Sequence, residues 1–197
     1  DPVMALFFGG LALGVATERT GLDERLTNFA LKASRGSYKK LLLLVILITA
    51  FFSMWISNIA AAALVFSSLR PVLASFEKND ILRRTLLIAV AFGADFGGIA
   101  TPVGTGPNAI AIASISHAQP VSFISWMLFA FPLTLGMLVL SFSLLIWRGQ
   151  KNENAWSDRN EKLIGMLPKN EYSKGFGSNQ KIFLAILLIT AIGWLTE

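Results

Sequence analysis

The sequence has no cysteine and little charge. Of its 197 residues, 15% are charged, whereas soluble domains average about 25%. The absence of cysteine excludes a disulfide-stapled fold and a thiolate metal site. A hydrophobic content of 54% excludes an intrinsically disordered chain. These deficits, together with long apolar runs, predict an integral membrane protein of several crossings with the lipid bilayer as its partner, and we expect it in a bacterial inner (plasma) membrane.

Basic residues are missing from every long apolar run. All 17 Lys and Arg fall within three stretches, residues 17–40, 70–84 and 148–181. These stretches flank apolar runs, as cytoplasmic loops do, and they lack the exposed aromatic residues of a nucleic-acid surface. The distribution therefore predicts membrane topology and no nucleic-acid partner.

The apolar and polar stretches together predict an all-α polytopic membrane protein. The expected organisation is a transmembrane helix over 1–16, a cytoplasmic amphipathic helix and loop over 17–40, a re-entrant hairpin over 41–69, a cytoplasmic loop over 70–84, a discontinuous transmembrane helix over 85–116, a transmembrane helix over 123–147, a cytoplasmic connector over 148–181, and the start of a further transmembrane helix over 182–197. The single histidine, His117, is expected in an external loop. We expect a second repeat outside this sequence.

The stretch 41–69 predicts a hairpin because one helix of this length would measure about 44 Å, against a hydrocarbon core of about 30 Å. Basic residues flank it on both sides, so both flanks are expected in the cytoplasm. The turn is expected near residue 55, where Ser53, Ser57 and Asn58 interrupt the apolar run. These residues either bind a solute or serve locally, the serines bonding to helical carbonyls and Asn58 capping the second half-helix.

A second interruption is predicted over residues 92–108, where five glycines and two prolines lie between apolar halves. We expect the first half-helix to end at about Asp95 and the next to begin at about Asn108. Half-helix N-termini at about Asn58 and Asn108 suit an anion, and C-terminal carbonyls at about Ile56 and Asp95 suit sodium. Without basic residues in the membrane, an anion would depend on helix dipoles and co-bound cations.

Asp95 is the only acidic residue inside an apolar run. A buried carboxylate is costly unless it is paired or protonated, and no basic residue of the apolar runs can pair with it. Three roles stay open at this point: Asp95 binds a cation, carries a proton, or caps the amides of Gly97 and Gly98.

Two motifs carry a resemblance to a known family, SMWISN at 53–58 and GGIATPVGTGPN at 97–108. The chain resembles the first repeat of the divalent anion/sodium symporter family, which includes sodium-coupled dicarboxylate, citrate and sulfate transporters. The resemblance implies an inverted-repeat fold, a homodimer, and a transport domain that moves against a scaffold. It implies a sodium site, and we count Asp95 with it; the candidate residues are Ser53, Ser57, Asn58, Gly98 and Asp95. It also implies a substrate site formed by Ser57, Asn58, Thr101, Pro102, Gly104, Thr105 and Asn108.

The sequence therefore predicts a secondary transporter that carries a small divalent anion with sodium. Sodium is the only metal expected, with no organic cofactor, and no enzyme activity is expected because the apolar runs hold no nucleophile with a base and an orienting group. The alternative is a sodium/proton or other cation antiporter, or an arsenite-type permease, that uses Asp95. Ile59 differs from the family pattern, since hairpin tips of this family typically carry threonine there.

Overall fold

The computed structural model describes residues 12, 15–16, 19–20, 22–77, 80–116, 121–149, 160–161, 163–165 and 177–195, and these residues contain helices and no strand. The all-α fold class predicted from the sequence is therefore confirmed for this part of the chain. The helices are α2 (Leu22–Ser34), α3 (Tyr38–Ser53), α4 (Asn58–Ala74), α5 (Ile81–Ile99), α6 (Gly106–Ser116), α7 (Phe123–Gly149) and α9 (Ser178–Leu195). The expected helix over 1–16, most of the connector over 148–181, and His117 lie outside the described residues.

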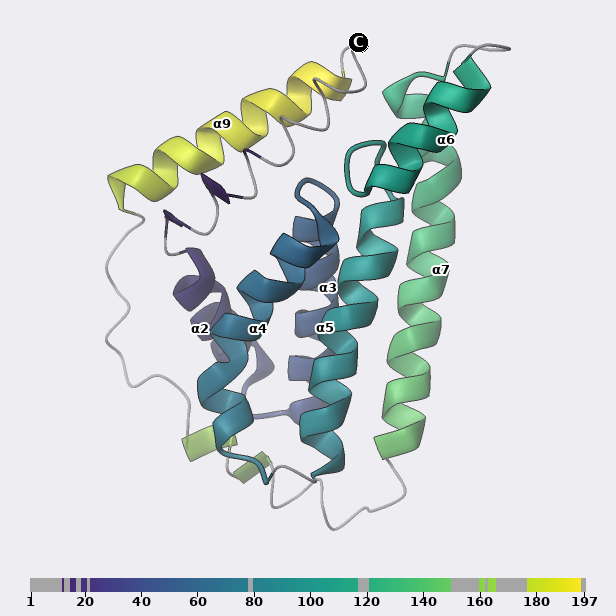
Figure 1. Cartoon of the computed structure of the whole chain (residues 1–197). Helices are drawn as coiled ribbons and strands as arrows, with labels where there is room; N and C mark the ends of the chain where they lie inside the picture. Colours follow the sequence, from purple (N-terminus) through teal and green to yellow (C-terminus); the bar gives the residue numbers. More distant parts are fainter. Residues whose placement is uncertain are drawn as a thin grey trace.

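Helices α3 and α4 form a hairpin whose turn occupies residues 54–57, so the interruption expected near residue 55 is confirmed. The hairpin is longer than its apolar run, because the helices extend outward through the basic residues Lys39 and Lys40 and through Arg70. Helix α5 packs along both α3 and α4. Figure 1 shows the hairpin turn close to the level at which α5 gives way to α6.

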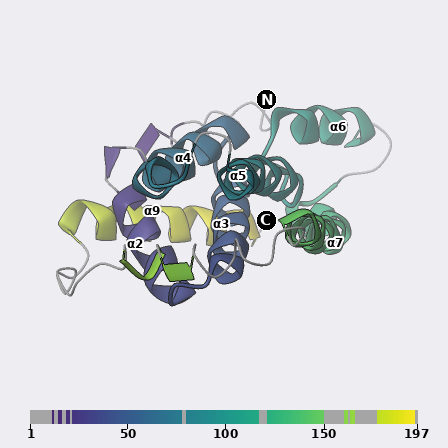
Figure 2. The same cartoon turned by 90° about the horizontal axis from the view of Figure 1, so that it is seen from below.

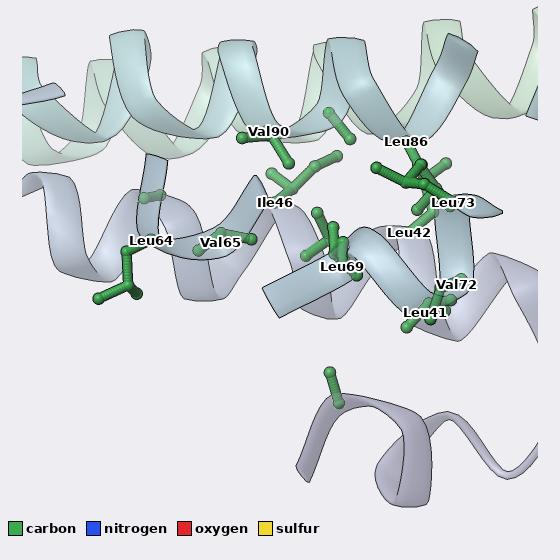
Figure 3. Close-up of a cluster of buried hydrophobic side chains, with 14 of the residues drawn as sticks. Leu41, Leu42, Ile46, Leu64, Val65, Leu69, Val72, Leu73, Leu86 and Val90 are labelled. Carbon is green, nitrogen blue, oxygen red and sulfur yellow. The ribbon is translucent and has the colours of Figure 1, made fainter. Parts of the chain in front are cut away.

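Apolar side chains from three helices fill the space between the hairpin and α5 (Figure 3). The labelled residues are Leu41, Leu42 and Ile46 of α3, Leu64, Val65, Leu69, Val72 and Leu73 of α4, and Leu86 and Val90 of α5. Leu41, Leu42 and Ile46 are fully buried. This cluster fixes α5 against the hairpin, and so it sets how the polar turn of the hairpin faces the end of α5.

Helix α5 runs past the point where the sequence analysis ends it. The prediction that the glycine-rich segment stops the helix at about Asp95 is wrong, because α5 continues to Ile99 and the interruption covers residues 100–105. The reason lies in packing. A Cβ on Gly93 would lie 2.8 Å from the Ile46 carbonyl oxygen, and one on Gly97 would lie 2.4 Å from Ala50 backbone atoms. These glycines allow close contact between two helices, as small residues do in membrane proteins, rather than breaking one.

Helix α7 lies along α5 and returns from the level of α6 (Figures 1 and 2). Among the described residues, it is the one helix long and apolar enough to cross a membrane, over Phe123–Arg148. Helices α4, α6 and α9 contain shorter apolar stretches. The division of the chain into membrane and cytoplasmic parts stays a prediction.

Candidate functional site

The candidate site lies where the hairpin turn meets the end of α5. The Thr101 hydroxyl, just after α5, donates a hydrogen bond to the Met54 carbonyl oxygen in the hairpin turn. The same hydroxyl accepts a hydrogen bond from the Gly104 backbone N–H at 3.1 Å. Thr101 is fully buried, so both contacts are shielded from solvent. Its hydroxyl thus joins the two interruptions that the sequence predicts.

Three oxygen atoms lie close together beside the hairpin turn. The Ser53 hydroxyl oxygen lies 2.9 Å from Asn58 Oδ1 and 2.6 Å from the Ala94 carbonyl oxygen. Ser53 is fully buried, and Asn58 is half-buried. A hydroxyl has one hydrogen, so in this arrangement it satisfies only one of the two acceptors. The Ala94 carbonyl oxygen lies within α5 and also accepts a helical N–H, so the acceptor left without a donor in this arrangement is Asn58 Oδ1, which suits a hard cation.

Two glycines allow the polar groups to approach this closely. A Cβ on Gly98 would lie 2.2 Å from Asn58 Oδ1. A Cβ on Gly104 would lie 2.4 Å from the Gly98 carbonyl oxygen and 2.8 Å from the Ser53 carbonyl oxygen. No larger residue fits either position without displacing the oxygen cluster or the backbone behind it. The structure thus brings together four of the predicted site residues, Ser53, Asn58, Gly98 and Gly104.

Asn108 ties the interrupted segment together. Its Nδ2 donates to the carbonyl oxygens of Gly98 and Thr101, each at 2.8 Å. Asn108 is 7% exposed and belongs to the first turn of α6. Asn108 therefore occupies carbonyl oxygens at the end of α5 and in the loop after it. The sequence analysis instead expects free C-terminal carbonyls near Asp95 that could bind sodium. Asn108 supports the loop, and a direct contact with substrate stays a prediction.

Ser57 and the first turn of α4 form the other side of the site. The Ser57 hydroxyl accepts a hydrogen bond from the Ala60 N–H at 3.3 Å, so Ser57 caps α4, whereas the local alternative expects the cap at Asn58. Among the residues that the structure describes, the backbone N–H groups of Asn58 and Ile59 have no acceptor. Two donors at a helix N-terminus leave a positive pole beside the oxygen cluster.

The remaining predicted residues occupy different positions. Pro102 is buried in the loop, and Thr105 is half-buried directly before α6. Asp95 is exposed, whereas its neighbour Ala94 is buried against the hairpin. Within the described part of the chain, the Asp95 side chain makes no hydrogen bond or ion pair. The structure thus does not bring its carboxylate to the oxygen cluster formed by Ser53 and Asn58.

Two residues of α7 contribute to the site without having been predicted. Trp126 Nε1 donates to the Ile99 carbonyl oxygen at 3.1 Å, and the Thr134 hydroxyl donates to the Phe96 carbonyl oxygen at 3.3 Å. These bonds satisfy carbonyls in the last turn of α5, which its own helix leaves open. Thr134 is buried within the apolar helix α7. In the sequence, a hydroxyl residue within this apolar run was the one indication that it has a polar partner.

The helix ends that carry basic residues, the start of α3 and the end of α4, lie at the opposite end of the hairpin from its turn (Figure 1). Lys40, near the start of α3, is separated from Met54 by 14 residues, or about 21 Å along the helix. Arg70 in α4, and Arg83 and Arg84 in α5, belong to the same far end. The positive potential at the site therefore comes from the α4 and α6 N-termini and from any bound cation.

Comparison with known proteins gives consistent matches to transporters. A family model described as citrate transporter matches residues 1–197. A protein of Haemophilus influenzae named as an uncharacterized transporter is 33% identical over 147 residues, covering 74% of this chain and 31% of the relative. The sodium-dependent low-affinity dicarboxylate transporter 1 of Caenorhabditis elegans is 26% identical over 194 residues, covering 71% and 33%. An inorganic phosphate transporter of Saccharomyces cerevisiae is 31% identical over 144 residues, covering 72% and 15%. The chain thus spans about a third or less of each relative.

Proposed function

This chain belongs to the citrate transporter family, and from that premise we propose that the protein carrying it is a secondary transporter that moves a divalent anion together with sodium. Family membership implies an integral membrane protein. We take the anion to be a dicarboxylate or citrate, because the matched family and a sodium-dependent relative are named for such substrates. Sulfate and phosphate are the other divalent anions to test.

The observation that carries this proposal is the oxygen cluster of Ser53, Asn58 and Ala94. The Ser53 hydroxyl has one hydrogen for Asn58 Oδ1 and the Ala94 carbonyl oxygen, and a sodium ion among the three oxygens would give Asn58 Oδ1 a positive partner. When no ion is bound, the Asn58 amide can turn its Nδ2 toward the Ser53 hydroxyl, and all three groups are then satisfied. The site is therefore stable both with and without an ion, as a coupling site must be. Ser57 and Gly98 complete the proposed sodium site.

The anion is proposed to bind beside the sodium ion, against the N-terminal ends of α4 and α6. The N–H groups of Asn58 and Ile59, which have no acceptor among the residues described, provide donors at the α4 end. Thr105 lies at the start of α6, and the loop from Thr101 through Pro102 and Gly104 to Asn108 shapes the wall between them. Because the basic residues of α3, α4 and α5 belong to the far end of the hairpin, a bound sodium ion would strengthen anion binding, which is a physical basis for coupling.

The membrane arrangement follows from the same proposal. The α3–α4 hairpin is re-entrant, with its turn near the membrane midplane, and α5 with α6 forms one interrupted crossing. The chain is one repeat of an inverted pair, the second repeat completes the substrate site, and the protein acts as a homodimer in the plasma membrane. Interrupted backbone is tolerated at that depth only where protein buries it or where it lines a cavity.

Uptake by reconstituted protein tests the proposal. Liposomes containing the protein that carries this chain would be given labelled succinate or citrate under an inward sodium gradient, or under a choline gradient of equal strength. We expect uptake with sodium only. Equal uptake in both gradients would contradict sodium coupling, and absence of uptake for every anion would contradict the proposed transport.

A pair of serine variants tests whether the oxygen cluster is responsible. Ser53→Ala removes one oxygen of the cluster and is expected to raise the sodium concentration for half-maximal uptake by about tenfold or more, which corresponds to about 1.4 kcal/mol of binding free energy. Ser141→Ala is the matched control, because Ser141 is also buried but bonds to the Met137 carbonyl oxygen within α7. A similar change in both variants would contradict the assignment.

A further inference from the structure

Asp95 is exposed on the side of α5 that faces away from the hairpin. Gly93 and Gly97, two residues before and two residues after it, lie against the backbone of α3. Two residues along a helix correspond to a rotation of about 200°, so the Asp95 side chain points away from α3. Its carboxylate has no hydrogen bond or ion pair within the part of the chain that the structure describes. The packing of these helices with one another therefore does not explain the charge.

The surface around this carboxylate is apolar. Leu87 and Ile88 are 36% and 39% exposed, and Ala91 is exposed as well. Four residues separate Leu87 from Ala91 and Ala91 from Asp95, so these side chains are neighbours along one stripe of the helix. We call Leu87, Ile88, Ala91 and Asp95 the outer face of α5. The helices α3, α4 and α7 pack around the other side of α5 (Figure 2) and leave the outer face exposed.

Lipid is an unsuitable neighbour for the outer face. The carbonyl oxygen of Ala94, the residue before Asp95, lies 2.6 Å from the Ser53 hydroxyl oxygen, so Asp95 is at the depth of the hairpin turn. A carboxylate at the depth proposed for this turn is costly unless it faces protein or water and has a partner. The chain spans about a third or less of each relative named above. Proteins of that length have further helices with which to cover the outer face.

The chemistry around Asp95 favours a basic side chain over a metal ion as its partner. A hard cation takes several oxygen ligands, whereas the neighbours of Asp95 on the outer face are apolar. Among the described residues, no group of three acidic or histidine side chains could hold a metal ion. A Lys or Arg carries its own hydrogen-bond donors and needs only the carboxylate. No apolar run of this sequence contains one, and Arg84 of α5 is about 17 Å away along the helix.

We infer that the outer face of α5 is an interface with a membrane helix of the same protein outside this sequence, and that this helix supplies a Lys or Arg that pairs with Asp95. The inference rests on the proposed function, because the proposed membrane arrangement places α5 in the bilayer. It gives Asp95 the role of joining two parts of the protein, separate from sodium binding at the turn. Loss of the charge should therefore lower stability and leave sodium affinity unchanged.

Removal of the charge distinguishes the possible neighbours of Asp95. Asp95→Asn keeps the shape of the side chain but leaves a basic partner unpaired, so the melting temperature of the full-length protein is expected to fall by about 3 °C or more. A carboxylate that faces lipid or water predicts an unchanged or higher melting temperature, and that result would overturn the inference. The matched control is Glu77→Gln, at an exposed residue beyond α4, which is expected to shift the melting temperature by less than about 1 °C.

Exchange of the two charges identifies the partner. Asp95→Lys brings two positive charges together and is expected to lower the yield of folded full-length protein by about tenfold or more. Each Lys or Arg in the membrane helices outside this sequence would then be changed to Asp, one at a time, and one of these second changes is expected to restore the yield. Restoration by none of them, or only by a change at a basic residue of this sequence, would overturn the inference. Absence of sodium-driven uptake in the wild-type protein would instead overturn the proposed function, because melting temperature and yield are measured without uptake.

Discussion

The two ends of the α3–α4 hairpin are built in opposite ways. At the base, Tyr38 is fully buried, and its hydroxyl is shared between the Leu82 carbonyl oxygen and the Thr85 hydroxyl. Asp80 Oδ1 caps α5 by accepting from the Leu82 N–H at 2.9 Å. Asn160 Oδ1, 122 residues further along the chain, accepts from the Tyr38 N–H at 3.0 Å. Helix ends at the base therefore have partners from nearby and distant residues.

At the turn, the polar groups of the same helices have fewer fixed partners. Ser53 has one hydroxyl hydrogen for two acceptors, Asn58 Oδ1 and the Ala94 carbonyl oxygen, and the first N–H groups of α4 lack an acceptor among the described residues. Unsatisfied polar groups at a structured site cost stability, which a ligand can restore. The difference suggests that the base holds the fold and that the turn is available to solutes. Substitutions at the base should therefore change stability, and substitutions at the turn should change ion binding.

The largest effect is expected from added volume near the turn. Gly97→Ala would place its Cβ 2.4 Å from Ala50 backbone atoms, and a helix backbone cannot move aside as a side chain can. We expect destabilisation of more than about 3 kcal/mol and poor recovery of folded protein, measured by size-exclusion chromatography and thermal unfolding in detergent. Gly136→Ala in α7 is the control, because its Cβ would meet nothing within 4 Å. Normal stability of Gly97→Ala would show that α3 and α5 do not pack this closely.

A smaller effect on stability alone is expected at the base. Tyr38→Phe removes the hydroxyl bonded to the Leu82 carbonyl oxygen and to Thr85. The expected loss is about 1–2 kcal/mol of unfolding free energy, seen as a lower melting temperature. The sodium concentration for half-maximal uptake should not change, because Tyr38 lies at the far end of the hairpin from the oxygen cluster. A change in sodium affinity would mean that the two ends are not independent.

The smallest effect on sodium affinity is expected from Asp95→Asn. The Asp95 side chain is exposed and lies outside the oxygen cluster, so sodium affinity at the turn should stay within about twofold of wild type. Sodium titration of succinate uptake measures this. Loss of sodium dependence in Asp95→Asn, together with proton movement driven by sodium in the wild-type protein, would instead favour the antiport alternative.

The hairpin turn was predictable from sequence because Ser53, Ser57 and Asn58 stand out within an apolar run. The end of α5 was not, because local composition does not tell whether a glycine such as Gly97 breaks a helix or admits a neighbouring one. The bonds from Trp126 and Thr134 to α5 depend on how α7 packs, which no local pattern specifies. The position of the turn was therefore easier to predict than the contacts that support it.

Sodium binding to the hairpin turn is most directly tested by thermal unfolding of the purified protein at increasing sodium concentration, with potassium at equal ionic strength as the reference. The oxygen cluster predicts that sodium raises the melting temperature of the wild-type protein. Asn58→Ala, which removes one of the cluster's three oxygens, should need about tenfold or more sodium for the same rise. An identical sodium response in wild type and Asn58→Ala would contradict the assignment of the sodium site to this turn.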